Sequence, residues 1–533
     1  MSKVATYLQG HITGHVLTRK DVCEKYADTL SVLSATPEMV VCPRSTNDIR
    51  KLVRFAWQLA EKGHSFGIST RGGGTDPTAS SLTHGALLSM TPSMSTLYEY
   101  EPKQHLLRAQ PGATVATAQS ALSLHGVKLP IPAEYPQATL GGAIANGELV
   151  DGSAAWVHQL EVVVDSGDVI QTGRISKHDF NKKSGKQGRE GDIYRGIDTV
   201  LEDHAELIAT LQKSDMHDRS GYPGITQVRG RGGSFDLTPL FVGSQGTLGI
   251  ISEMIVEARF APRERVYAAA YFANSEIARD ALDQFEKQSP ALLEYIDGAF
   301  VAEALDQGNI YPWLKLSDAQ ARQVAAGTLI VIGFDEFNDR KRSRSLSKLR
   351  KKLDKLDCIY TTSTESDIET LRRVVDYTAL PAAHADRAAP EIVPGFYVPR
   401  ARFEDFLVNL AKLADSLHVD IPLHGDIKSG RYSVRPTFSL QRVADKQKLF
   451  KLIDSLNALI VEHGGALVAH GGEGRLLSRF VRADWSDEYE KMVDEIKAVF
   501  DPHGMLNLGV KQPVELRELV AELRSDNSSN ATL

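Results

Sequence analysis

A run of three glycines is the clearest candidate for chemistry in this 533-residue chain. Successive glycines have no Cβ atom, so the backbone can approach a ligand closely. Their N–H groups can form a concave nest that favours a phosphate oxygen. A preceding arginine can add a charge-assisted contact. We therefore predict a phosphate-binding loop made of Arg71, Gly72, Gly73, Gly74, Thr75 and Asp76.

The surroundings of this loop exclude two common phosphate-binding motifs. The loop lacks the Gly-x-x-x-x-Gly-Lys-Ser/Thr of a P-loop, and no Gly-x-Gly-x-x-Gly opens a helix as in a Rossmann fold. Instead, apolar spacing predicts an amphipathic helix at 45–63, a strand at 65–70 that leads into the glycines, and another strand at 86–90. For an isolated glycine run, a plain turn is the alternative interpretation.

Two further glycine clusters follow, at 139–147 and 242–253. The three clusters have the order and rough spacing of the PCMH-type FAD-binding domain in the vanillyl-alcohol-oxidase superfamily. The chain resembles in particular the D-lactate, glycolate and D-2-hydroxyglutarate dehydrogenase branch. Residues 500–509 resemble the terminal signature of that family, with Leu508 in place of a proline. The resemblance covers about residues 20 to 511.

The resemblance implies that FAD binds to these clusters. It assigns Arg71 to Asp76 to the pyrophosphate, and Pro136 to Gly142 with Ile250 and Ile251 to the adenosine and the flavin ring. Relatives that bind FAD covalently carry a histidine after the glycines, where this chain has Thr75, so we expect non-covalent FAD. Outside the first loop, the implied cofactor-binding residues are Pro136, Thr139, Gly141, Gly142, Ile250, Ile251 and Asn507.

The metal motif of the branch is altered in this chain. Dehydrogenases of the branch carry His-x-Gly-Asp-Gly-Asn-x-His and a later Glu-His-Gly, in which two histidines and a glutamate bind a divalent metal. Here His424 is displaced by one position, and Gly430 or Arg431 replaces the second histidine. Ala469 stands where the glutamate belongs, before His470. With at most two of three ligands left, we predict no metal site.

Cationic side chains are the predicted replacement for the metal. An arginine can bind a carboxylate through a bidentate fork, and Arg372 matches an arginine of the branch. We predict Arg372, Lys428 and Arg431 as substrate-binding residues. A neutral His470 would accept a hydroxyl proton, so the predicted catalytic residues are His470, Arg372 and His424. The alternatives are that Arg431 faces water on a strand and that His470 is a hydrogen-bonded core residue.

The order of predicted elements indicates an α+β fold. We predict a two-subdomain PCMH-type FAD-binding domain over 1–262. An α/β substrate (cap) domain with an antiparallel sheet follows over 263–475, and residues 476–533 return to the flavin and end in a frayed tail. The expected cap strands are 266–272, 328–334, 421–426 and 466–470. The expected cap helices, on one side of the sheet, are 275–288, 403–416 and 444–463.

The composition excludes several classes of protein. A net charge of −7 offers no broad basic field for nucleic acid. Three widely separated cysteines form no metal pattern and are typical of a reducing compartment. The chain starts without an apolar signal sequence, and no stretch approaches the roughly 18 apolar residues of a membrane span. We expect a soluble, cytoplasmic protein.

The segment 340–355 differs from this acidic background. It carries nine basic residues around a stripe of leucines: Arg340, Lys341, Arg342, Arg344, Lys348, Arg350, Lys351, Lys352 and Lys355. One interpretation is an ordinary amphipathic helix with a solvated face. The other is a docking surface, either for peripheral contact with the inner face of an anionic membrane or for an acidic electron-transfer partner.

Together these features predict an FAD-linked dehydrogenase or oxidase acting on CH–OH groups. The predicted substrate is a small hydroxylated molecule, a D-2-hydroxy acid such as D-lactate, with hydride transfer to FAD. The predicted electron acceptor is not NAD but a quinone, a flavoprotein or oxygen. Two alternatives remain: a non-acid alcohol as substrate, favoured by the missing metal ligands, and a flavin-binding subunit without catalytic activity.

Overall fold

The computed structural model describes residues 3–131, 137–149, 154–214, 217–261, 265–306, 308, 311–364 and 388–525. The contacts within the chain divide it into two compact units. The first unit is formed by residues 1–260 together with 468–523, and the second centres on 261–467. The chain therefore leaves the first unit once and returns to it near the C-terminus.

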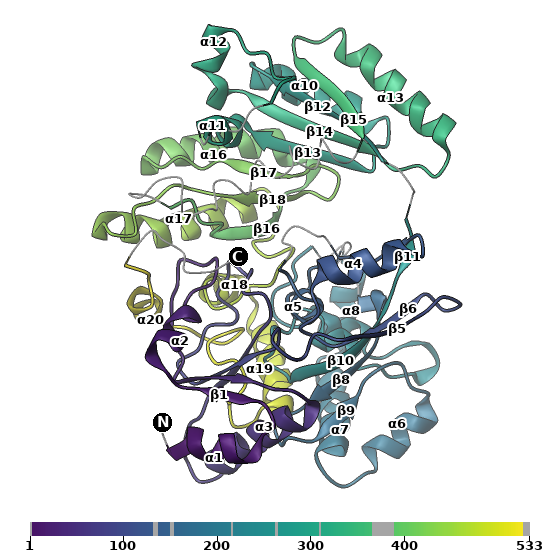
Figure 1. Cartoon of the computed structure of the whole chain (residues 1–533), viewed down its shortest axis with the longest axis vertical. Coiled ribbons are helices and arrows are strands. Elements are labelled where there is room, and N and C mark those ends of the chain that lie inside the picture. The colour runs from purple at the N-terminus through teal and green to yellow at the C-terminus, as the bar shows by residue number, and fades with distance from the viewer. Residues whose placement is uncertain are drawn as a thin grey trace. The chain divides into compact units, whose positions relative to one another are not determined.

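The first unit contains two main sheets (Figure 1). One has the order β1-β2-β4-β3, with β4 parallel to both β2 and β3; its strands are β1 (His15–Leu17), β2 (Met39–Cys42), β3 (Ile68–Arg71) and β4 (Ala86–Ser89). The other is antiparallel, in the order β5 (Leu97–Glu101), β6 (Leu106–Ala109), β10 (Ile250–Glu257), β8 (Val157–Val163) and β9 (Val169–Gln171). A short pair joins β7 (Val127–Lys128) to β11 (Arg259–Phe260).

Helices surround these sheets and end where the sequence supplies caps. The helix expected at 45–63 is confirmed as α3, whose N-cap Ser45 accepts a hydrogen bond from the Asp48 amide. Its apolar stripe is buried. The first-unit helices are α1 (Lys3–His11), α2 (Lys20–Lys25), α3 (Thr46–Ala60), α4 (Val115–Ser123), α5 (Leu140–Asn146), α6 (Lys177–Ser184), α7 (Arg189–Asp203), α8 (Ala205–Lys213), α9 (Thr238–Phe241), α18 (Ser478–Asp484), α19 (Asp487–Phe500) and α20 (Leu516–Ala521).

Each sheet of the first unit has its own hydrophobic core. Ile68, Leu88 and the buried stripe of α3 belong to one core. Leu160, Val256 and the buried face of α19 belong to the other. Met505 and Leu506, near the C-terminus, pack into the first of these cores. The returning segment is therefore an integral part of the unit that holds the glycine loop.

The second unit is built on one antiparallel sheet in the order β15-β12-β14-β13-β17-β18-β16. Its strands are β12 (Val266–Phe272), β13 (Leu292–Asp297), β14 (Thr328–Phe334), β15 (Ile359–Thr364), β16 (Val393–Tyr397), β17 (Leu423–Asp426) and β18 (Arg431–Val434). Its helices are α10 (Ser275–Glu286), α11 (Gly298–Asp306), α12 (Asp318–Ala321), α13 (Asp339–Leu353), α16 (Phe403–Leu417) and α17 (Val443–Glu462). The expected α+β class and antiparallel sheet are confirmed.

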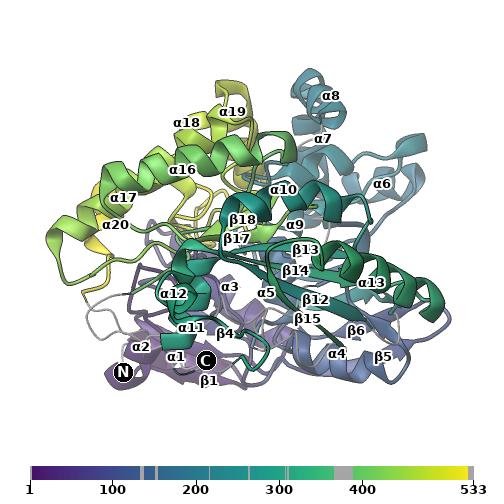
Figure 2. The same cartoon turned by 90° about the horizontal axis from the view of Figure 1, so that it is seen from above.

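Helices lie on both faces of this sheet, although the sequence predicted one side only. The helices α10, α13 and α16 lie over one face (Figure 2). Side chains alternate between the two faces of a strand. On the opposite face, Tyr267, Ala269, Leu329 and Val331 form a core with α11.

The strand expected at 466–470 is wrong. Only Ala466 forms an isolated bridge, with Tyr397. Gly471 and Gly472 follow with φ of 79° and 69°, in the left-handed region that no β-strand adopts. The glycines therefore turn the chain where the apolar residues before them predicted a strand.

Candidate active site

A pocket in the first unit brings the three glycine clusters together. Its volume is about 810 Å³, including space open to solvent. Pro136 lies outside the described residues, and Asn507 binds two residues of the pocket wall. Eleven predicted cofactor-binding residues line the pocket: Arg71, Gly72, Gly73, Gly74, Thr75, Asp76, Thr139, Gly141, Gly142, Ile250 and Ile251.

Close packing explains the three glycines of the first loop. A Cβ atom on Gly72 would stand 2.1 Å from the Thr139 hydroxyl, and one on Gly73 would stand 2.0 Å from the Gln137 carbonyl oxygen. Gly74 has a φ of 72°, and a Cβ there would stand 2.4 Å from the Arg71 guanidinium. No side chain fits at these three positions, so their backbone forms this part of the pocket wall. This arrangement fits a phosphate-bearing ligand.

The two charged residues of the loop bind protein groups. The Arg71 guanidinium donates to the Tyr26 carbonyl oxygen at 3.1 Å and lies 5.5 Å from the centre of the Tyr26 ring. The Asp76 carboxylate accepts from the Ser80 amide at 2.6 Å and the Thr78 hydroxyl at 2.7 Å. Burial raises the pKa of Asp76, and these hydrogen bonds oppose the rise. Both residues therefore hold the loop in shape, and their direct contact with a pyrophosphate stays a prediction.

The second glycine cluster forms the start of α5 at the pocket. Thr139 is the N-cap, and its hydroxyl accepts from the Gly142 amide at 3.2 Å. Gly141 packs so closely that a Cβ would stand 2.5 Å from the Cβ of Pro111. Thr139, Gly141 and Gly142 all line the pocket. The positive end of the helix dipole therefore adds to an environment that favours an anion.

Asn507 joins parts of the pocket wall that lie far apart in sequence. Its side-chain oxygen accepts from the Ser69 hydroxyl at 2.7 Å. Its amide donates to the carbonyl oxygens of Ser80, at 2.7 Å, and of Gln245. Gln245 also accepts from the Gly474 amide at 2.9 Å. The prediction missed Gln245 as a site residue, although it stands inside the third glycine cluster; its left-handed φ of 53° marks a constrained turn.

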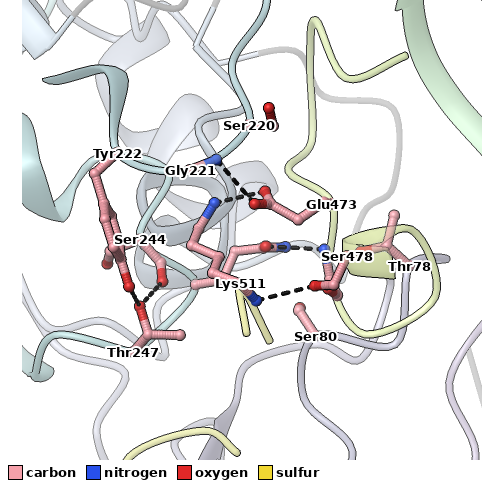
Figure 3. A network of polar contacts seen from close by, with 12 residues as sticks. Thr78, Ser80, Ser220, Gly221, Tyr222, Ser244, Thr247, Glu473, Ser478 and Lys511 are labelled. Carbon is pink, nitrogen blue, oxygen red and sulfur yellow. Dashed lines mark hydrogen bonds and ion pairs between the residues drawn. The ribbon is translucent and has the colours of Figure 1, made fainter. Parts of the chain in front are cut away.

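A fully buried ion pair lies in a polar network near Ser80 and Ser244, two residues of this wall (Figure 3). The Lys511 ammonium lies 2.5 Å from a Glu473 carboxylate oxygen, and both side chains are 0% exposed. The other Glu473 oxygen accepts from the Gly221 amide at 2.9 Å. The Lys511 amide donates to the Ser478 hydroxyl at 3.0 Å. Three distant chain segments are thus tied together, and nothing in the local sequence of either residue predicts the pair.

His470 belongs to the first unit, whereas the sequence placed it within a substrate domain ending at 475. It is half-buried and precedes the Gly471–Gly472 turn. A Cβ on Gly472 would stand 2.5 Å from the Gln245 carboxamide carbon. The turn after His470 therefore packs on a residue of the pocket wall. Its role as a base stays a prediction, and Arg372 lies outside the described residues.

The second unit brings His424 and Arg431 to one face of its sheet. In the pairing of β17 with β18, Asp426 is opposite Arg431 and His424 is opposite Ser433, and directly opposed residues share a face. The His424 Nε2 atom lies 3.8 Å from a Glu391 carboxylate oxygen and has no hydrogen-bond partner among the described residues. Arg435 binds the other Glu391 oxygen at 3.2 Å. The prediction missed Glu391.

Burial keeps His424 neutral. It lowers the pKa of His424 to about 4; the nearby Glu391 opposes this and Arg435 adds to it. Lys428 lies in the turn between the strands, and its ammonium donates to the Pro290 carbonyl oxygen at 2.6 Å. Within the described ranges, no three His, Cys, Asp or Glu side chains are grouped to hold a metal. The predicted lack of a metal stays a prediction.

Comparisons with known proteins extend over both units. Residues 37–173 match the family described as FAD binding domain, and residues 261–510 match FAD linked oxidases, C-terminal domain. The chain is 26% identical to a D-2-hydroxyglutarate dehydrogenase of Pantoea ananatis, over 92% of this chain and 50% of that protein. It is 23% identical to a D-lactate dehydrogenase of Archaeoglobus fulgidus, over 88% of this chain and 90% of that protein.

The fold also matches a solved structure. The 4-ethylphenol oxidase of Gulosibacter chungangensis, in an isoeugenol complex, aligns over 96% of this chain and 97% of its own, with a TM-score of 0.66 and 17% identity. The chain spans about half the length of the D-2-hydroxyglutarate dehydrogenases it matches. No helix within the described part of the chain combines the length and hydrophobicity needed to traverse a bilayer.

The glycine-lined pocket and the two consecutive family matches agree with each other. The chain therefore belongs to the FAD-linked oxidases and dehydrogenases, is similar among them to D-lactate, glycolate and D-2-hydroxyglutarate dehydrogenases, and has FAD as its cofactor.

Proposed function

We propose that this enzyme oxidises the hydroxyl group of a D-2-hydroxy acid such as D-lactate and passes the electrons to an acceptor other than NAD. The main support for the proposal comes from the sheet of the second unit. There a neutral His424 and the cationic Arg431 lie on the same face. A cation and a neutral imidazole suit a molecule that has a carboxylate next to a hydroxyl. The names of the hydroxy-acid dehydrogenases that this chain resembles support the same class.

The pocket of the first unit fits FAD. The side-chain-free loop at Gly72 to Gly74 and the first turn of α5 would hold the pyrophosphate. Thr75 stands where a linking histidine would be, so the cofactor is held without a covalent bond at this position. When bound, FAD supplies the redox chemistry of the reaction. The protein supplies positioning and charge.

The predicted catalytic and substrate-binding residues would divide the work of binding and proton transfer. His470, on the turn that packs against Gln245, would accept the substrate hydroxyl proton. Arg372 and Arg431 would bind the carboxylate, while the ammonium of Lys428 is already bonded to Pro290. His424 would contact the substrate as a neutral group. We also propose that no divalent metal takes part, because Ala469 replaces the expected glutamate.

An anaerobic screen tests the proposal directly. The holoenzyme is mixed with D-lactate, D-2-hydroxyglutarate and glycolate, with the L-enantiomers and sugar alcohols as controls, and the visible flavin absorbance is followed. We expect bleaching by D-2-hydroxy acids that chelators do not prevent. Admission of oxygen or of a soluble quinone then identifies the acceptor class. A His470→Asn variant should bleach more slowly at unchanged FAD content.

The second candidate is the oxidation of a non-acid alcohol, favoured by the altered metal motif around His424 and Ala469. Bleaching by sugar alcohols but not by hydroxy acids would support it. Bleaching by neither class would favour a flavin-binding subunit. Activity that is lost with a chelator and restored by Zn²⁺ or Mn²⁺ would contradict the metal-free mechanism.

A further inference from the structure

The outward side of α13 is a continuous cationic surface. Leu349 and Leu353 are buried against the sheet on the other side of this helix. At 3.6 residues per turn, five basic residues of the helix fall within an arc of roughly 100° opposite these leucines, and Lys355, in the turn after the C-cap Asp354, extends the row. We call them the basic face; they are Arg340, Lys341, Arg344, Lys348, Lys351 and Lys355, all exposed.

Among the described residues, the basic face has no acidic partner. The other three basic residues of the segment have partners: Arg342 binds Asp339 at 2.7 Å, Arg350 donates to the Thr362 hydroxyl, and Lys352 donates to the Gln284 carbonyl oxygen. No carboxylate within the described ranges forms an ion pair with any residue of the basic face. No other described part of the chain therefore competes with an external partner for these six charges.

The charge of this segment is opposite to that of the rest of the protein. Residues 339–355 contain nine basic and two acidic side chains, a surplus of seven positive charges. Since the whole chain carries −7, the remainder carries −14. An anionic partner would be repelled by most of the protein and attracted here. Docking would therefore be oriented as well as local.

An aromatic residue stands at the start of the basic face. Phe337 is 69% exposed and comes directly before Asn338, the N-cap of α13, whose side chain accepts from the Lys341 amide at 3.1 Å. Aromatic rings are favoured at the boundary between water and lipid. In an acidic protein partner the ring would need a matching apolar pocket, whereas a lipid headgroup layer accepts it anywhere.

The helix is also held rigidly by its own unit. Its buried leucines pack on the sheet, and α13 lies beside β12 and β15 (Figure 1). A straight row of cations then needs no ordering on binding, so less entropy is lost. We propose that the basic face, with Phe337 as an aromatic anchor, docks the protein on an anionic lipid surface. Mobile anionic headgroups can match the row without any fixed complementary shape.

Vesicle co-sedimentation with the full-length holoenzyme tests this proposal. Vesicles of phosphatidylcholine with about a third phosphatidylserine should bind the protein, while pure phosphatidylcholine should not, and rising salt should weaken the binding. The triple variant Arg344→Gln/Lys348→Gln/Lys351→Gln should bind on the order of 100-fold more weakly, since each cation near an anionic surface contributes roughly fivefold. Phe337→Ser should weaken binding at high salt more than at low salt.

A matched control removes three exposed lysines from the first unit, Lys177→Gln/Lys182→Gln/Lys213→Gln. It changes the net charge equally and should bind like the wild type. Equal losses in both triple variants would show that total charge, and not the basic face, decides binding. If the protein is retained on immobilised polyglutamate but does not bind to vesicles, the basic face binds an acidic protein. That result would overturn the lipid proposal. The test does not depend on the substrate of the enzyme.

Discussion

Single glycines support the cofactor pocket for two different physical reasons. Gly74 adopts a left-handed backbone conformation that residues with a side chain disfavour. Gly73 has an ordinary φ, but the Gln137 carbonyl group leaves no space for a Cβ atom. At Gly73 a side chain is therefore excluded by steric contact and not by the backbone angle. The distinction matters, because alanine is excluded at Gly73 as firmly as a larger residue.

Replacing Gly73 should abolish FAD binding. In Gly73→Val, the new Cβ would stand 2.0 Å from the Gln137 carbonyl oxygen, so the loop must move away from its position in the pocket wall. We expect FAD occupancy below roughly a tenth of the wild-type value, measured from the flavin absorbance of the purified protein. Gly10→Val is the control, because a Cβ there meets nothing within 4 Å. Normal flavin content in a folded Gly73→Val protein would contradict this assignment of the loop.

The link between FAD and the chain can be tested at Thr75. Because no histidine follows the glycines, acid precipitation should release FAD into the supernatant and leave a colourless pellet. The flavin in the two fractions is measured by fluorescence. Flavin that stays with the precipitated protein would mean a covalent bond through another residue.

His424 should make stability depend on acidity. Its pKa is about 4 in the folded protein against an ordinary 6.5, so below pH 6.5 the unfolded chain binds a proton that the folded chain does not. The contribution of His424 to the free energy of unfolding is fully present above pH 6.5. It is lost as the pH falls towards 4, by about 3 kcal/mol in all. His424→Gln should reduce this loss in urea unfolding at pH 7, 5.5 and 4.5. The exposed His178→Gln should not, and equal pH slopes for wild type and His424→Gln would refute the assignment.

At the scale of elements, a buried charge pair holds the returning C-terminal segment. Glu473 precedes α18, and Lys511 lies beyond α19, yet the two meet without access to water. Removing one partner leaves the other charged and buried, which typically costs about 3–5 kcal/mol, whereas removing both is often close to neutral. The pair therefore couples the turn after His470 to the end of the chain.

We predict that Lys511→Met lowers the free energy of unfolding by about 3–5 kcal/mol and that Glu473→Gln/Lys511→Met recovers most of it. Urea unfolding of both single variants and of the double variant gives the coupling free energy between the Glu473 and Lys511 side chains. Because Glu473 lies one residue before Gly474, which binds the pocket-lining Gln245, Lys511→Met should also weaken FAD binding. The exposed Arg19–Asp21 pair is the control, and Asp21→Asn should leave both quantities unchanged. Additive effects in the double variant would show that the charges are not coupled.

At the scale of the whole molecule, the two units differ in how the chain builds them. The second is formed mainly by one continuous stretch, residues 261–467, with its own sheet and core and a short piece from Arg524 onward, whereas the first needs long segments from both ends of the chain. A unit with its own core can in principle fold alone. The excised fragment 261–467 should therefore show a cooperative urea transition followed by circular dichroism. In the fragment 1–467, which lacks residues 468–533, the first unit should neither fold nor bind FAD. A non-cooperative transition of 261–467 would contradict the division.

The sequence alone determined the elements and the first loop of the site. Helix α3, strands β12 and β14 and the glycine clusters were predictable, because apolar periodicity and backbone sterics act over a few neighbouring residues. The same local reasoning was wrong at 466–470, where Gly471 and Gly472 turn the chain. The roles predicted for Arg71 and Asp76 rested on residue type, which cannot tell a ligand contact from a contact within the protein.

Tertiary structure alone decided which distant groups meet. Gly221 and Glu473 lie 252 positions apart, and Lys511 becomes buried only when both ends of the chain pack into one unit. His424 acquires its low pKa, and Glu391 its place beside it, from the packing of the second unit. Burial and long-range pairing depend on how the whole chain is packed. For this reason no local sequence pattern predicts these contacts and the low pKa of His424. They follow only from the three-dimensional structure.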